Sequence, residues 1–167
     1  MAQAKGKVTV SQAGKEKSSE AHDSQSLSPD KLREIHSAMV KARALEERLI
    51  KMGKSGEGYF WIGGPGEEAF AIPLGMMVKK GEGIDHDYLH LHYRASGILM
   101  GMGADATDSI RQMKGVATDP YSGGRNFVNH YSKRDWNIVP VSSCIEPQYL
   151  QALGTAHAQR GDRASGI

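Results

Sequence analysis

Apolar residues at helical spacing between positions 32 and 52 constrain this chain more than any other feature. Ser28, Pro29 and Asp30 precede them, in the order of a helix cap, a first helical residue and a first-turn acid. The apolar positions share one helix face: Leu32, Ile35, Met39, Ala42, Leu45, Leu49 and Met52. Because Gly53 can end a helix, we predict one long packing helix over residues 29–53.

Short apolar segments alternate with helical segments in the rest of the chain. We predict strands within residues 58–62, 87–94 and 136–143, and helices at 95–102, 105–114, 147–161 and from Glu67 onward. This alternation indicates an α/β fold in which helices flank a parallel sheet. About three strands can be counted, against the roughly five or six of a mean sheet. We therefore expect an incomplete domain.

Residues 1–28 differ in composition from the remainder. They contain no aromatic residue and are rich in Lys, Ser, Gln and Ala. Such a segment cannot bury enough apolar surface to offset the entropy of ordering, so we predict a disordered tail before a domain at 29–167. A tether or docking segment for a larger assembly is the alternative.

Charge and hydropathy bound the partners. The net charge of +2 and the lack of a dense basic block argue against nucleic acid. No apolar run approaches the ~18 residues of a membrane span, and the first residues lack the apolar core of a secretory signal. Together with a single cysteine, this favours a cytoplasmic protein. Cys144 has no adjacent basic residue, so we expect it to be buried and inert.

The stretch DYLHLHYRASG, residues 87–97, allows three interpretations. His90 and His92 share one face of a strand and could begin a zinc site. Alternatively, Arg94 lies at the carboxyl end of the strand, where open α/β sheets bind ligands, and Tyr93 beside a guanidinium suits a phosphate. Arg94 could also simply pair with a surface carboxylate.

Three other segments carry candidate site residues. The IGGPGEE turn lacks the ending of a phosphate loop, so we expect its glycines to allow close backbone approach, with Glu67 or Glu68 structural or paired. The VPVSSCIEPQ turn can line a ligand, hold a monovalent cation or merely cap a helix. His130 is the strongest general acid or base candidate, with a solvated loop histidine as the alternative.

Five motifs in order resemble one enzyme family: ARALEERLI, YFWIGGPGEEAF, HYRASG, QMKGVATDPYSGGRNFVNHYS and VPVSSCIEPQYLQALGTAHA. Over residues 29–160 the chain resembles the alpha subunit, or alpha-like half, of the thiamine-diphosphate-dependent decarboxylating component of 2-oxo acid dehydrogenase complexes. The resemblance implies an incomplete thiamine-diphosphate-binding fold. It also implies that Tyr93 and Arg94 grip the cofactor diphosphate, while Ser143 and Ile145 support its aminopyrimidine ring and bent shape.

The resemblance implies further roles. Phe60 matches an aromatic residue of the substrate pocket, and His130 matches a histidine of the active-site region. Ser142 and Gln148 fall on a turn that binds potassium in some members, although Pro147 replaces the usual threonine there.

The implied reaction is decarboxylation of a 2-oxo acid and transfer of the acyl group to a lipoyl domain, with branched-chain acids favoured over pyruvate. The implied cofactors are thiamine diphosphate and magnesium. The implied partners are a beta subunit or beta-like half, a lipoyl acyltransferase core and further copies of the chain. The family's magnesium motif would follow Ile167, so we expect the chain alone to be inactive. A non-catalytic assembly module is the alternative function.

Overall fold

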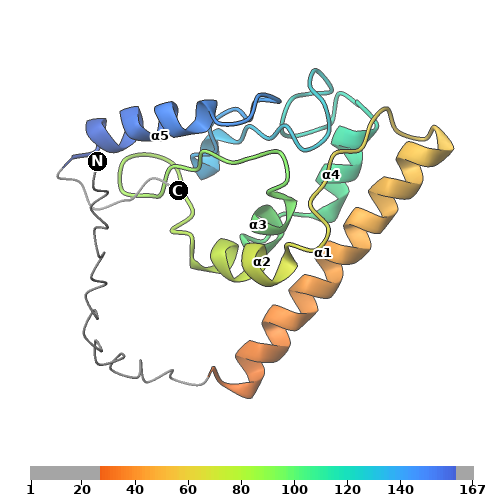
Figure 1. Ribbon diagram of the computed structural model, residues 1–167, viewed down its shortest axis with the longest axis horizontal. Coiled ribbons are helices and arrows are strands. Elements are labelled where there is room, and N and C mark those ends of the chain that lie inside the picture. Colours follow the sequence, from red (N-terminus) through yellow and green to blue (C-terminus); the bar gives the residue numbers. More distant parts are fainter. Residues whose placement is uncertain (1–26, 161–167) are drawn as a thin grey trace, which may run out of the picture.

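The computed structural model describes residues 27–160. The elements are α1 (Pro29–Ser55), α2 (Glu68–Met77), α3 (Ser96–Gly101), α4 (Ala106–Met113), a 3-10 turn η1 (Arg134–Trp136) and α5 (Pro147–Ala158). Helix α1 runs along one side and contacts α2, α3 and α4, while α5 lies at the opposite edge (Figure 1). Apart from positions 27 and 28, the predicted tail lies outside the described residues, as do residues 161–167.

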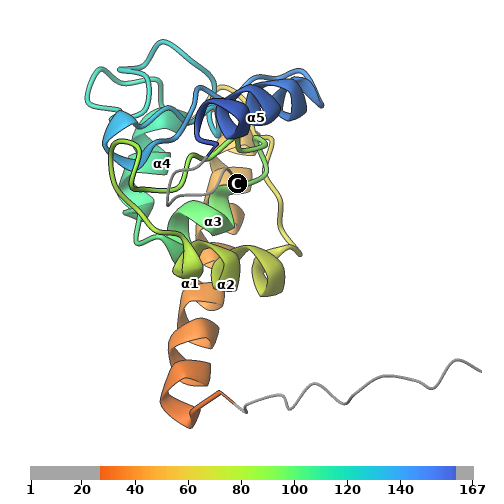
Figure 2. The same ribbon diagram turned by 90° about the vertical axis from the view of Figure 1, so that its left-hand side faces the viewer.

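Helix α1 begins as predicted and ends two residues later than predicted. The Ser28 hydroxyl accepts a hydrogen bond from the Lys31 amide at 3.2 Å, which caps the first turn. Gly56, with φ of 76°, provides the left-handed stop, whereas Gly53 remains helical. The second half of the apolar face is buried, but Leu32 is 52% exposed. The first turns of α1 project from the rest of the structure (Figure 2).

The predicted strands do not form within residues 27–160. The segments around Leu89 and Ile138 instead make one parallel bridge. The Leu89 amide donates to the Asn137 carbonyl at 3.0 Å, and the Val139 amide donates to the Leu89 carbonyl at 3.0 Å. Two paired segments are marginal without further strands, so local propensity alone does not give a sheet here. The parallel sheet therefore stays a prediction, supported at this one pair.

Two apolar clusters form the core. The larger surrounds Leu89, Leu99 and Tyr131, and the smaller joins Leu49 of α1 to Met113 of α4. Helices α2 and α3 can cross closely because Gly75 has no Cβ atom; a Cβ atom there would collide with the Ile98 carbonyl. The core thus lies between α1 and the extended segments that carry the predicted site residues.

Helix α5 differs from the others in having no buried residue. Its apolar side chains are largely exposed: Tyr149, Leu150 and Leu153. None of the helices within residues 27–160 is long and apolar enough to cross a membrane.

Candidate functional site

Aromatic rings from three distant segments form a continuous series of contacts, called here the aromatic stack, in which two contacts are edge-on and one is parallel. The Phe60 ring lies 6.3 Å from the Phe127 ring, which lies 5.8 Å from the His130 imidazole. The imidazole stacks on Tyr93 with a centroid distance of 6.1 Å and an interplanar angle of 14°. The Arg94 guanidinium lies 5.1 Å from the Tyr93 ring. The fold therefore brings the predicted substrate-pocket, catalytic and diphosphate-binding residues together.

Ser143 joins this group through His130. The Ser143 hydroxyl oxygen lies 2.6 Å from Nε2 of His130, and Nδ1 lies 3.1 Å from the Val128 carbonyl. A carbonyl can only accept, so the geometry places a proton on Nδ1, and in the neutral imidazole Nε2 accepts the hydrogen bond from Ser143. The pair can therefore take up a proton at Nε2 through the serine hydroxyl.

An amide network holds the backbone of His130. The Gln112 side chain, on α4, donates to the His130 carbonyl at 3.0 Å and accepts from the Asn129 amide at 2.8 Å. The Asn129 side chain donates to the Ile62 carbonyl at 2.9 Å. Asn129 has a φ of 64°, a left-handed conformation that asparagine tolerates better than most residues. Gln112 and Asn129 lie within one of the five motifs, but no role was predicted for them because their hydrogen bonds join residues 17 or more positions apart.

Arg94 is exposed at the rim of a hollow of 350 Å³ that Glu67, His90 and His92 also line. Within residues 27–160, no carboxylate lies within 4.0 Å of its guanidinium, so the surface ion pair considered for Arg94 does not form. An exposed and unpaired guanidinium fits an anionic group such as a diphosphate.

The surroundings of the two histidines in this hollow lower their pKa values. Burial is the main cause that lowers the pKa of His92, and the nearby Arg94 charge lowers it further, while Glu67 opposes both. Burial also lowers the pKa of His90. Neutral imidazoles can offer hydrogen bonds to a bound group, and Arg94 supplies the positive charge. Tyr93 is only 6% exposed, so its ring mainly supports Arg94 and His130.

The zinc interpretation of His90 and His92 finds no support in the described part of the chain. No three His, Cys, Asp or Glu side chains are grouped there as metal ligands. Asp87, a neighbour of both histidines in sequence, instead accepts from the Lys79 amide at 2.8 Å. The same residues therefore do not fit a magnesium site.

The turn at residues 142–146, called here the serine turn, lies directly before α5 and is largely exposed. Ile145 is 64% exposed, and the Ser142 hydroxyl accepts from the Cys144 amide at 3.1 Å. Cys144 is exposed, so its predicted burial was wrong: the turn leads to a helix with no buried residues. The buried amide nitrogen of Gln148 has no hydrogen-bond partner within residues 27–160. Because that atom is a donor, it adds nothing to the predicted potassium site.

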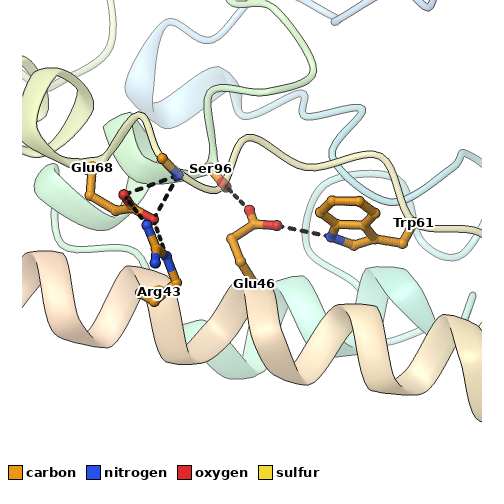
Figure 3. Close-up of polar contacts among 6 residues, drawn as sticks. Arg43, Glu46, Trp61, Glu68 and Ser96 are labelled. Carbon is orange, nitrogen blue, oxygen red and sulfur yellow. Dashed lines mark hydrogen bonds and ion pairs between the residues drawn. The ribbon is translucent and has the colours of Figure 1, made fainter.

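Of the two acidic residues that follow the glycine turn, Glu67 and Glu68, the second forms an ion pair. Glu68 binds Arg43 through two hydrogen bonds, from Nε to Oε1 at 2.6 Å and from Nη2 to Oε2 at 2.8 Å (Figure 3). Its carboxylate also accepts from the Gly66 amide at 3.1 Å. The Arg43 hydrogen bond is the main cause that lowers the pKa of Glu68 to about 2. The expectation that Glu67 or Glu68 is paired is confirmed for Glu68.

Comparison with known proteins identifies the family. The family model described as "Dehydrogenase E1 component" matches residues 36–166. The chain therefore belongs to the dehydrogenase E1 component family, which binds thiamine diphosphate and has an α/β fold. This confirms the resemblance inferred from the five motifs.

The most similar curated proteins include alpha subunits of 2-oxoisovalerate dehydrogenase. The Bacillus subtilis subunit is 28% identical over 146 residues, covering 87% of this chain and 43% of that protein. The Pseudomonas aeruginosa subunit is 28% identical over 138 residues, covering 81% and 32%. The human mitochondrial subunit is 25% identical over 142 residues, covering 84% and 30%. The chain thus spans less than half the length of these relatives.

Proposed function

We propose that this chain forms one wall of the thiamine diphosphate site in a decarboxylating dehydrogenase component that acts on a branched-chain 2-oxo acid. The observation that carries the proposal is the convergence of Phe60, Tyr93, Arg94, His130 and Ser143, which lie in four separate segments of the sequence. The alpha subunits of 2-oxoisovalerate dehydrogenase among its relatives support the substrate class.

Each residue has a role that its surroundings support. The exposed guanidinium of Arg94 would bind the diphosphate, with Tyr93 holding the guanidinium through its ring. Ser143 and the exposed Ile145 would support the aminopyrimidine ring. Thiamine diphosphate, when bound, supplies the electron-accepting chemistry of decarboxylation. Phe60 would cover the apolar part of the substrate.

His130 would act as a general base at the site, accepting a proton at Nε2. Its Nδ1 proton is held by the Val128 carbonyl, which leaves the Nε2 lone pair directed at the Ser143 hydroxyl. A proton released near Ser143 can therefore pass through the hydroxyl to Nε2. The burial of His130, which is 4% exposed, keeps water from competing for this atom.

Partners would complete the enzyme. We propose a beta subunit or beta-like half, a lipoyl acyltransferase core that receives the acyl group, and association of further copies of this chain in the cytoplasm. The magnesium ligands would come from outside residues 27–160, because the described residues do not supply them. A potassium ion at Ser142 and Gln148 remains part of the proposal.

Calorimetry tests cofactor binding directly. The full chain is titrated with thiamine diphosphate in magnesium buffer, and thiamine serves as the matched ligand without phosphates. The proposal predicts saturable binding of thiamine diphosphate and at least about tenfold weaker binding of thiamine, since each lost charge-assisted hydrogen bond costs more than 1.4 kcal/mol. Equal affinity for the two ligands, or no binding of either, contradicts it.

An assembly module is the second candidate, favoured by the exposed apolar side chains of α5: Tyr149, Leu150 and Leu153. Contiguous apolar surface of this kind is typical of interaction sites. It predicts association that Leu150→Lys abolishes, measured by sedimentation, together with no binding of thiamine diphosphate.

A further inference from the structure

We propose that Glu46 is a positioning residue, which holds together three segments that carry the candidate site residues. Its role in cofactor binding rests on the proposed function, but its structural role does not. Glu46 lies on α1 outside the aromatic stack and is only 3% exposed. A buried carboxylate on a packing face is costly unless its oxygens are hydrogen-bonded, so its presence demands a reason.

The two carboxylate oxygens of Glu46 bind two different segments (Figure 3). Oε2 accepts from the Trp61 indole nitrogen at 2.9 Å, and Oε1 accepts from the Ser96 hydroxyl. Trp61 directly follows Phe60 of the substrate-pocket segment. Ser96 begins α3, two residues after Arg94. The Glu46 side chain therefore fixes the segment that carries Phe60 relative to the segment that carries Arg94.

The network continues to the segment of His130. Tyr131 directly follows His130 in the sequence. Tyr131 is fully buried, and this burial raises the pKa of its hydroxyl well above the ordinary value. The hydroxyl stays protonated and donates to the Asn129 side chain at 2.9 Å.

Asn129 joins the segment of His130 to the segment of Trp61. Its side-chain nitrogen donates to the carbonyl of Ile62, the neighbour of Trp61. The hydrogen bonds thus run from Tyr131 through the Asn129 side chain to the segment of Trp61, which Glu46 in turn joins to Ser96. Connected buried hydrogen bonds rigidify a core when every member is satisfied.

The glycine turn adds a steric constraint. A Cβ atom at Gly63 would collide with the Glu46 carboxylate, and one at Gly64 would lie 2.8 Å from the Arg94 carbonyl oxygen. The two glycines therefore let the turn pass between Glu46 and the Arg94 backbone. Glu46 contacts the turn on one side and Arg94 contacts it on the other.

The test compares Glu46→Ala and Glu46→Gln with Glu47→Ala, a control at an exposed position of the same helix. Amide hydrogen exchange of the full chain is followed in residues 60–66, 93–97 and 129–132. Glu46→Ala should speed exchange in all three segments by about tenfold or more over the control, because the first two lose a hydrogen bond to the carboxylate and the third is joined to the first through Asn129 and Ile62. Glu46→Gln should restore most protection, since its amide can accept from Trp61 and donate to Ser96.

Two outcomes overturn the proposal: faster exchange confined to residues 60–66, or equal acceleration throughout residues 27–160. If Glu46→Ala does not fold, single-bond variants decide. Trp61→Phe should then speed exchange in residues 93–97, and Ser96→Ala in residues 60–66. If each substitution speeds exchange only in its own segment, Glu46 does not couple the segments.

Cofactor binding is measured separately on the same proteins. If the wild type binds thiamine diphosphate, Glu46→Ala should weaken binding by about tenfold and Glu46→Gln by less than about threefold, as expected for a group that preorganises a site. Unchanged affinity in Glu46→Ala removes Glu46 from site positioning. A wild type that does not bind overturns the proposed function, and the exchange experiment still decides whether Glu46 couples the three segments.

Discussion

The His130 imidazole and the Ser143 hydroxyl, 13 residues apart in the chain, form a hydrogen bond of 2.6 Å between Nε2 and Oγ. This contact joins the loop before η1 to the turn before α5. The Val128 carbonyl on the other side of the ring accepts from Nδ1 and so selects the tautomer of the neutral imidazole. In that tautomer, the accepting nitrogen of His130 is directed at a serine on the exposed turn.

Nitrogen NMR of the imidazole checks this tautomer. We predict that Nδ1 of His130 carries the proton at neutral pH. Ser143→Ala should shift the Nε2 resonance toward that of a nitrogen without a hydrogen bond, whereas Ser132→Ala should leave it in place. A proton found on Nε2 in the wild type would contradict the geometry.

The Arg43 and Glu68 pair predicts how stability depends on pH. The pKa of Glu68 is lowered from 4.5 to about 2. Its contribution to the free energy of unfolding is therefore fully present above pH 4.5 and is lost as the pH falls toward 2. Urea unfolding between these limits should show stability rising with pH. Arg43→Gln should flatten that rise, because the carboxylate loses its main hydrogen-bond partner. An unchanged slope in Arg43→Gln would show that the pair does not cause the pH dependence.

The two halves of α1 should respond differently to truncation. Leu49 is fully buried, so Leu49→Ala should lower the free energy of unfolding by about 2–5 kcal/mol. Leu32→Ala, at a half-exposed position of the same apolar face, should change it by less than about 0.5 kcal/mol. Urea unfolding measures both, and equal losses would mean that the first turns of α1 are also covered in solution.

Cys144 provides a probe of the serine turn. It is the single cysteine of the chain and is exposed, so a maleimide should label it as fast in the native protein as in urea. Thiamine diphosphate should slow labelling, because the adjacent Ser143 and Ile145 would contact the cofactor. Labelling that requires urea would indicate a buried thiol.

Local signals in the sequence predicted the helices, whereas the predicted strands at 87–94 and 136–143 pair only through an isolated bridge. Ser28 capped α1 and Asp105 capped α4, since both caps depend on residues within three positions. The end of α1 was misplaced because Gly53 and Gly56 carry the same local signal, and packing of Met52 in the core keeps the helix going past Gly53. A strand is stable only when it pairs with others, and within residues 27–160 Ile138 makes isolated bridges with Leu89 and Lys133.

The sequence motifs also predicted only part of the candidate site. The motifs placed Tyr93, Arg94, His130 and Ser143 in one family pattern, but residue types alone could not predict the hydrogen bond between His130 and Ser143. The roles of Glu46 and Gln112 could not be predicted either, because a polar residue within a packing helix shows its purpose only when its partners from distant segments are in place.

Binding of thiamine diphosphate to Arg94→Gln tests the central claim most directly. Arg134→Gln is the matched control, since Arg134 is also exposed but pairs with Glu82 away from the hollow. In magnesium buffer, calorimetry should show saturable binding to the wild type and to Arg134→Gln, and binding weaker by about tenfold or more to Arg94→Gln, as expected for a lost charge-assisted hydrogen bond. Equal affinity in Arg94→Gln and Arg134→Gln would contradict the account, because the anion would then bind elsewhere.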